Sequence, residues 1–270
     1  MLFGQPDFFT PYSFSDWILR GPHLSYYSTS ALKSTLEQLV DFERINTSKE
    51  MRFSVGAVNL RTGRLVYFDN AEITIRPEHV MASGALPPAF PPIEIGDDYY
   101  WDGGLVSNTP LQYLLEQEDV RDSLVFQVDL FSARGDLPRD MASVLGRHKD
   151  IMYSSRTRNN TDAFRRIHNL RLKLRDALLR VPTDQRTDDD RAILASMEDV
   201  PQVNIVHLIY QQKSYEGHAK DYEFSGTSMR EHWTAGYEDT RKTLRHRRWL
   251  EIPPEDIGMV VHDVHRDDPS

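Results

Sequence analysis

The sequence predicts an α/β layer fold, and three observations along the chain support this prediction. Residues 99–101 form a short strand-like run, a helix start lies near residue 110, and the apolar run 123–130 reads as a buried strand. The order strand, turn, helix, strand is typical of layered α/β architectures. A chain of 270 residues buries roughly 73% of its unfolded surface on folding, so a sizeable core is available.

The first quarter of the chain contains signals for a helix and a hairpin. The run 28–30 (Ser-Thr-Ser) offers caps for a helix whose apolar residues recur at helical spacing over 32–43. Residues 51–60 and 65–68 are strand-like and flank the turn 61–64 (Arg-Thr-Gly-Arg), which predicts a β-hairpin.

Two further helix starts follow. A short helix is predicted over 77–85, because proline suits its first position and the run 86–88 (Leu-Pro-Pro) must end it. Thr109 and Gln112 have the spacing of a capping box, and Pro110 would be the first helical residue. We therefore expect a second helix to begin at Pro110.

A polar, basic region follows the strand 123–130. Residues 134–191 contain 14 basic and 9 acidic side chains, a net charge of +5, whereas the whole chain has a net charge of -9. We predict a helical excursion from the main domain, with residues 183–191 as an exposed loop. One narrow apolar stripe at helical spacing runs along a basic helix in this region. It consists of Phe164, Ile167, Leu170, Leu174, Ala177 and Leu178.

The chain then returns to alternating strand and helix signals. The β-rich run 203–210 predicts a strand, and a last helix is expected over about 228–250. The predicted organisation is a main α/β domain over 1–133, a charged helical excursion over 134–200, and a strand-plus-helix C-terminal region over 201–270.

Composition excludes several classes of function. The chain has no cysteine, which excludes disulfides, thiolate metal sites and a cysteine nucleophile. The net charge of -9 argues against nucleic acid as a partner, because such binding depends on neutralising phosphates. The sequence has no apolar run of about 18 residues and no signal-peptide pattern. We therefore expect a cytoplasmic protein.

Asp102-Gly103-Gly104 is the first candidate for chemistry. In isolation such a triplet is more often a bare turn, since Asp hydrogen-bonds its own backbone and Gly adopts positive φ freely. Here the acidic residue ends a short strand, and the two glycines let a ligand or another backbone approach closely. This position suits a general base.

Three segments resemble a known family in order and spacing: residues 79–92 (HVMASGALPPAFPP), 100–104 (YWDGG) and 108–110 (NTP). They are similar to the second half of patatin-like phospholipases, in particular the bacterial branch with an additional C-terminal domain, and the likeness extends through most of the chain. The resemblance implies a partial patatin-like central sheet flanked by helices, with a helix-rich C-terminal extension. It also implies hydrolysis of lipid acyl esters by a Ser-Asp dyad, without a histidine, metal or cofactor. Asp102 matches the dyad aspartate, and Gly103 and Gly104 would shape its turn.

The nucleophile of such a dyad is not found in this sequence. No serine has glycine at both the second position before and the second position after it, so a G-x-S-x-G elbow is absent, as is a Gly-rich oxyanion loop. Ser83 lies in Ala-Ser-Gly-Ala, a degenerate elbow, but the resemblance makes this position structural. Asn108 is expected to be a helix-entry residue. In the family both missing elements precede the region that resembles residues 1–4. A split gene, a misplaced start codon and a true truncation fit equally well.

The leading hypothesis is therefore part of a patatin-like serine acyl-ester hydrolase of the lipase or phospholipase A type, which supplies the base and not the nucleophile. The alternative is a non-catalytic truncated scaffold with a binding or regulatory role. The expected partners are a lipid or other acyl-ester substrate, and either the missing N-terminal half or a second copy, because a domain without its first strands exposes an apolar sheet edge.

The histidines support structural interpretations. His207 lies in an apolar strand and is expected to be a buried core residue. A metal site near the C-terminus is less favoured than a polar tail, because no further ligand cluster supports it. Its candidate ligands are His262, Asp263, His265, Asp267 and Asp268. Residues without motif spacing, expected at the surface, are His218, Asp221, Glu231 and His232.

The last predicted helix is basic and aromatic. In a lipid enzyme such a face could rest on an anionic membrane, which would make the protein peripheral to it. We favour an ordinary solvated face with the aromatic rings turned into the core, because acidic residues dilute the charge. The basic residues are Arg241, Lys242, Arg245, His246, Arg247 and Arg248, and the apolar ones are Trp233, Tyr237, Leu244 and Trp249.

Overall fold

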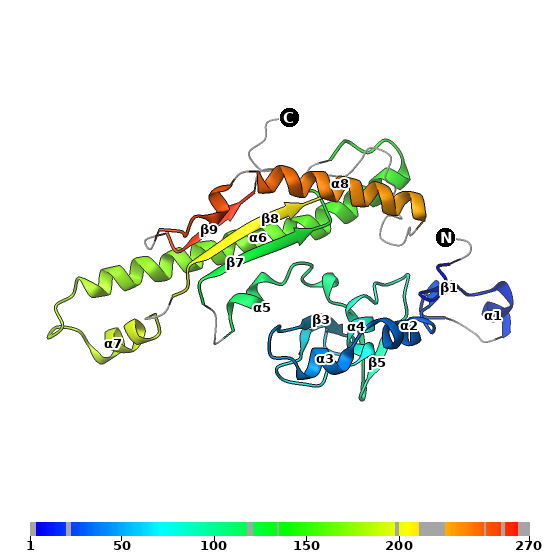
Figure 1. The fold of residues 1–270 in the computed structure, drawn as a ribbon, viewed down its shortest axis with the longest axis horizontal. Coiled ribbons are helices and arrows are strands. Elements are labelled where there is room, and N and C mark those ends of the chain that lie inside the picture. Colours follow the sequence, from blue (N-terminus) through cyan, green and yellow to red (C-terminus); the bar gives the residue numbers. More distant parts are fainter. Residues whose placement is uncertain are drawn as a thin grey trace. The chain divides into compact units, whose positions relative to one another are not determined.

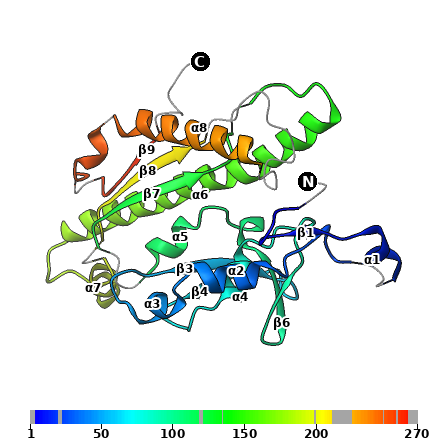
Figure 2. The same ribbon diagram turned by 45° about the vertical axis from the view of Figure 1, so that its right-hand side comes forward.

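The structure, a computed structural model, describes residues 4–19, 23–117, 121–133, 135–197, 200–210, 225–245, 247–254 and 257–263. It combines helices with several sheets, which confirms the predicted α/β class. The chain forms two compact units, one of Met1–Asn108 with Ala219–Ser225 and one of Thr109–His218 with Gly226–Ser270. Figures 1 and 2 show the elements of both units.

The first unit is built on a four-stranded antiparallel sheet with the strand order β4-β3-β6-β5, and β1 and β2 form a separate pair (Figure 1). Its strands are β1 (Thr10–Pro11), β2 (Tyr27–Ser28), β3 (Ser54–Asn59), β4 (Leu65–Asp69), β5 (Ile93–Ile95) and β6 (Asp98–Asp102). Its helices are α1 (Phe14–Leu19), α2 (Leu32–Leu39), α3 (Phe42–Thr47), α4 (Pro77–Ser83) and the 3-10 turn η1 (Gly103–Leu105).

The hairpin predicted from residues 51–68 is confirmed as β3 and β4. In its turn, Asn59 Oδ1 accepts hydrogen bonds from the backbone N–H groups of Arg61 and Thr62, at 3.0 and 3.1 Å. The strand predicted at 99–101 is part of β6. Its hairpin partner β5 was not predicted, because three residues are too few to show a period.

The helix predicted over 32–43 is divided in two. Helix α2 ends at Leu39, and Asp41 caps α3 by accepting the N–H of Arg44 at 2.8 Å. The predicted serine and threonine caps of the first helix are wrong, because its N-cap residue is Ala31 and makes no side-chain cap bond. The break follows from Asp41, whose side chain competes for backbone N–H groups and starts a new helix.

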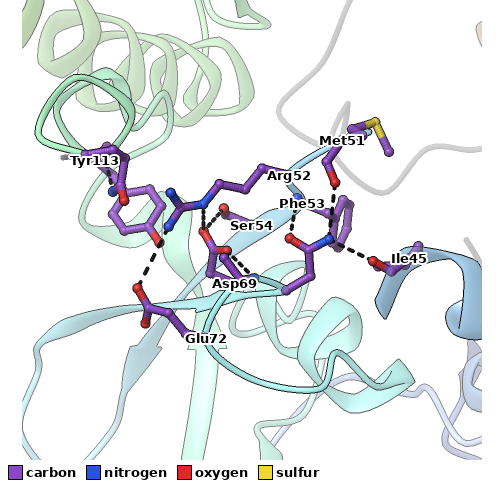
Figure 3. A network of polar contacts seen from close by, with 11 residues as sticks. Ile45, Met51, Arg52, Phe53, Ser54, Asp69, Glu72 and Tyr113 are labelled. Atoms are coloured by element: carbon purple, nitrogen blue, oxygen red, sulfur yellow. Dashed lines mark hydrogen bonds and ion pairs between the residues drawn. The ribbon is translucent and has the colours of Figure 1, made fainter. Parts of the chain in front are cut away.

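A polar network fixes the open end of the β3–β4 hairpin (Figure 3). The carboxylate of Asp69 is fully buried and accepts from Arg52 Nε at 2.7 Å, from the Ser54 hydroxyl, and from the backbone N–H of Ala71 at 2.8 Å. The side chain of Asn70 binds the backbone of neighbouring segments in the same network. Because the ion pair and hydrogen bonds satisfy the carboxylate locally, we assign Asp69 and Ser54 a structural role.

The second unit has a three-stranded parallel sheet with the order β7-β8-β9, and Figures 1 and 2 show α6 and α8 on opposite sides of it. Helix α5 packs with the sheet through a core of Leu111, Val203, Ile205 and Met259. The strands are β7 (Ser123–Asp129), β8 (Val203–Ile209) and β9 (Met259–His262). The helices are α5 (Leu111–Leu115), α6 (Met141–Leu179), α7 (Asp188–Ala195), α8 (Gly226–Leu244) and the 3-10 turn η3 (Arg247–Leu250).

The two apolar runs predicted as strands differ in burial. Strand β8 is almost entirely buried, as its continuous apolar sequence predicts for the centre of a parallel sheet. Strand β7 lies at the edge, and the prediction that it is buried is wrong for one of its faces. Leu124, Phe126 and Val128 are 42%, 48% and 56% exposed. The other face is covered by α6, where Gln127 Oε1 accepts a hydrogen bond from the Thr161 hydroxyl at 3.2 Å.

The apolar stripe noted in the sequence is not the buried face of α6. Ile167, Leu170 and Leu174 are exposed, whereas His168 and Leu172 are buried against the sheet side of the helix. On the sheet, the buried side chain of Gln127 accepts a hydrogen bond from the Thr161 hydroxyl of this helix. The buried polar side chain of Thr161 is therefore satisfied by a hydrogen bond to the sheet.

Three further predictions need correction. Residues 183–191 are not only loop, because Thr187 and Asp190 form a capping box that starts α7 inside this segment. His262, which was expected in a polar tail, lies on strand β9. The second predicted cap is wrong too, because α5 begins at Leu111 with Pro110 as its N-cap residue, and Gln112 bonds Glu116 within the helix.

Candidate active site around Asp102

Asp102 is the last residue of β6, where the chain leaves the antiparallel sheet. It pairs with Ala57 of β3, and its backbone N–H donates to the carbonyl of Ala85 at 3.1 Å. Its side-chain Oδ1 accepts the N–H of Gly104 at 2.7 Å and so caps η1. Strand pairing and turn together fix the direction of this partly exposed carboxylate, as a positioned acid or base requires.

Gly103 and Gly104 are each required for a different structural reason. A Cβ on Gly103 would lie 2.5 Å from the carbonyl oxygen of Gly56, so only glycine lets the turn lie against β3. A Cβ on Gly104 would lie 3.0 Å from Asp102 Oδ1 and 3.3 Å from Asn108 Oδ1. Gly104 therefore leaves room beside the carboxylate, on the side where Asn108 also approaches.

An apolar cavity of about 220 Å³ lies in the same unit. Its wall includes Leu32, Leu36, Val80, Met81, Gly84 and Ala85, from α2, α4 and the segment after α4. Ala85 is also the residue whose carbonyl accepts the Asp102 N–H. Ala85 therefore belongs to the cavity wall and also bonds the backbone of the candidate base.

Ser83 is occupied within its own helix. Its hydroxyl donates to the carbonyl of Val80 at 2.9 Å, a common arrangement for serine near a helix end. It lies at the last position of α4, whereas an elbow nucleophile stands at a turn from a strand into a helix.

His79 carries a role that the sequence reading missed. At the third position of α4 its Nδ1 accepts the N–H of Arg76 at 2.9 Å, as glutamate or glutamine does in a capping box. The ring is buried, 4.5 Å from that of Phe68. Burial, and then the positive charge of Arg76, lower the pKa of His79, so the neutral ring that accepts this bond is favoured. Its position two residues after Pro77 was the signal available in the sequence.

The other candidate residues that the structure describes lie in the second unit. His207 is buried, as predicted, and its Nδ1 lies 3.5 Å from Asp263 Oδ2. His262 lies on β9, and its Nε2 is 3.0 Å from Asn204 Oδ1. His232 lies on α8 and is partly buried against the ring of Tyr210, while Glu231 is exposed. His218, Asp221, His246, His265, Asp267 and Asp268 lie outside the described residues.

Within the described ranges, no three His, Asp or Glu side chains come together as a metal site would require. The described helices also include none that is both long and apolar enough to cross a bilayer.

The last helix ends at Leu244, and the segment to Leu250 continues as η3. The prediction that its aromatic rings turn into the core is wrong for Trp233 and Tyr237, which are 76% and 63% exposed. It is correct for Trp249, which is partly buried and packs edge-on against Phe126.

Comparison with known proteins agrees with the resemblance seen in the sequence. Residues 3–115 match the family model described as Patatin-like phospholipase, which covers the Asp102 turn and the apolar cavity. Residues 151–256 match a second model, described as Patatin phospholipase, which covers most of α6, β8 and α8. A search of curated proteins finds no match. From these two matches, which follow one another along the chain, we conclude that it belongs to the patatin-like phospholipase family.

Proposed function

We propose that this chain is the base-supplying part of a serine acyl-ester hydrolase that acts on lipids, with Asp102 as the general base. Family membership supports the class of reaction. The observation that carries the assignment is the carboxylate of Asp102, which is fixed at the end of β6 and linked through Ala85 to an apolar cavity.

In this proposal the serine belongs to a segment with a G-x-S-x-G elbow, outside the present sequence. Asp102 takes the proton of the serine hydroxyl while the serine oxygen bonds to the acyl carbon. The carbon–oxygen bond to the alcohol then breaks, and Asp102 returns the proton to that alcohol. Water repeats both steps on the acyl-serine, which releases the fatty acid and restores serine and carboxylate.

The apolar cavity of the same unit is suited to the acyl chain. Its wall includes Leu32, Leu36, Val80 and Met81, and its volume is about 220 Å³. In this proposal the acyl chain lies in the cavity and the head group remains outside.

The test compares the chain alone with the chain co-expressed with a segment that carries the elbow and the oxyanion loop. We expect no p-nitrophenyl ester hydrolysis and no stable fluorophosphonate labelling from the chain alone, and both from the combination. Asp102→Asn should reduce the combined activity at least ~100-fold, the usual contribution of general-base catalysis.

Asp97→Asn is the matched control, because it makes the same change on the exposed β5–β6 turn. Ser83→Ala should also retain nearly full activity. Full activity with asparagine at position 102, together with loss of activity in His207→Gln or His232→Gln, would show a Ser-His-acid arrangement instead. If no upstream segment restores activity, the non-catalytic scaffold is the better description.

A further inference from the structure

Helix α6 presents an apolar stripe to solvent along its second half. Ile167, Leu170 and Leu174 are 58%, 67% and 41% exposed, and their spacing of three and four residues places them on one face. Scattered exposed apolar residues are common on protein surfaces, but a continuous stripe on one helix marks an interaction surface.

This stripe lies opposite the face of α6 that packs in the unit. Leu172 is 2% exposed and packs inward. At about 100° per residue, Leu170 and Leu174 each point roughly 200° away from Leu172. Substitutions in the stripe therefore change the outer surface and leave the packing of α6 on the sheet intact.

Basic side chains flank the stripe. From residue 159 to 180 the chain has six basic and two acidic residues. Both acidic side chains are paired, Asp162 with Arg165 and Asp176 with Arg175. Arg166, Lys173 and Arg180 are exposed and recur every seven residues, so they form a row beside the stripe. Apolar residues flanked by a basic row are the pattern of helices that lie on anionic lipid surfaces.

Two alternatives fit the charges less well. One is docking of the lipid surface on helix α8, and the other is docking of a second copy of the chain on the α6 stripe. Helix α8 also exposes apolar side chains, namely Met229, Trp233 and Tyr237, but from Gly226 to Leu244 it has three basic and three acidic residues and no net charge. A second copy of the chain on the α6 stripe would bring two basic rows together, and like charges oppose this. Because α6 and α8 lie on opposite sides of the sheet, one flat membrane cannot meet both outer faces.

We infer that the outer face of α6 docks on an anionic lipid surface, with Ile167, Leu170 and Leu174 inserted and Arg166, Lys173 and Arg180 at the head groups. This docking does not depend on Asp102 being catalytic, so it can be tested on the purified chain alone.

The test is cosedimentation with vesicles of phosphatidylcholine alone or with 30% phosphatidylglycerol, chosen as about a third anionic lipid. We expect binding to the anionic vesicles only, weakened by salt. Replacing Ile167, Leu170 and Leu174 together by glutamine should weaken it at least tenfold. Replacing Arg166, Lys173 and Arg180 by glutamine should weaken it about a hundredfold, since each basic residue near such a surface contributes roughly fivefold.

Matched control variants test whether the loss of binding is specific to the α6 face or follows from removing any exposed basic or apolar residues. Lys49→Gln with Arg64→Gln removes exposed basic residues from the first unit and should leave binding unchanged. Glutamine at Met229, Trp233 and Tyr237 should also leave it unchanged. Loss of binding with this α8 variant and not with the α6 variants would overturn the inference. So would equal binding to neutral vesicles, or a lipid-free dimer that the α6 variant abolishes.

Discussion

At the scale of single residues, Gly103 determines where the candidate base lies. Its lack of a side chain allows the turn to approach Gly56 of β3, and that approach holds Asp102 at the end of its strand. A larger residue at position 103 would displace the Asp102 carboxylate, although residue 103 itself takes no part in proton transfer. The motif therefore combines one candidate catalytic residue, Asp102, with two glycines that are needed because a side chain there would be crowded by its neighbours.

His79 provides a prediction about pH. The pKa of His79 is lowered in the folded chain, chiefly by burial, whereas in the unfolded chain it is near 6.5. Below about pH 6.5 the unfolded state therefore binds more protons than the folded state, and stability falls as the pH falls. We expect the urea midpoint to decrease from pH 7.5 to 5.5, and to decrease less in His79→Gln.

Glutamine is chosen because it can accept the Arg76 N–H at this helix position without titrating. The control is His148→Gln on the exposed surface of α6. Burial also lowers the pKa of His168 and His262, so the wild-type slope contains their contributions with the same sign. Only the difference between wild type and His79→Gln reports on His79. Identical slopes in the two proteins would show that His79 does not couple to unfolding.

At the scale of elements, the sequence predicted the helices and strands that are determined by a short stretch of neighbouring residues. The β3–β4 hairpin, α4 and β8 follow from a turn sequence, a proline and a continuous apolar run. It did not identify those that depend on tertiary packing. The inward face of α6 contains Thr161, whose hydroxyl donates to Gln127 of the sheet, and no periodicity in α6 reveals this contact.

In the candidate site, too, the sequence predicted the local motif and not the features that depend on tertiary packing. The resemblance pointed to Asp102 and its glycines, since a motif is local. The cavity was not predicted, because its walls come from α2, α4 and loop segments that are distant in sequence. The cap made by His79 was missed because histidine is a rare capping residue, and only the observed bond to Arg76 identifies it.

The cavity between α2 and α4 leads to a prediction at this scale. Leu36→Phe should fill part of it and weaken the binding of decanoic acid, measured by displacement of a polarity-sensitive fluorescent probe. Each methylene that is excluded costs about 0.8 kcal/mol, or roughly fourfold in affinity. Exclusion of two methylenes would therefore weaken binding by an order of magnitude.

Leu39→Phe is the control, since it makes the same change at an exposed position of the same helix. Binding of the fatty acid does not require the serine, so a failure here would be separate from a failure of the Asp102 assignment. Equal affinity in the two variants would show that the acyl chain does not occupy this cavity.

At the scale of the whole molecule, the two family matches cover successive parts of the chain. The match at 3–115 contains the candidate base, and the match at 151–256 contains the basic half of α6. Chemistry and proposed attachment to lipid therefore belong to different parts of the chain. The division into regions 1–133, 134–200 and 201–270 stays a prediction.

The edge of the parallel sheet gives the last prediction. Among the described strands, β7 pairs with β8 on one side only, and Leu124, Phe126 and Val128 are exposed on one of its faces. An apolar edge strand of this kind promotes association. We expect sedimentation velocity to show reversible, concentration-dependent self-association of the chain. Lysine at both Leu124 and Val128 should raise its dissociation constant at least tenfold, because charges on an edge oppose pairing.

Lysine at Leu39 and Met51, two exposed positions of the first unit, is the matched control and should leave association unchanged. Glutamine at the three α6 positions should also leave it unchanged without lipid, which separates this surface from the proposed membrane face. If the proposed segment that carries the serine adds its strands beside β7, its co-expression should suppress self-association as activity appears. A chain that stays monomeric at all concentrations and melts in one sharp transition would contradict this expectation, because such a fold needs no further strands, and it would favour the non-catalytic scaffold.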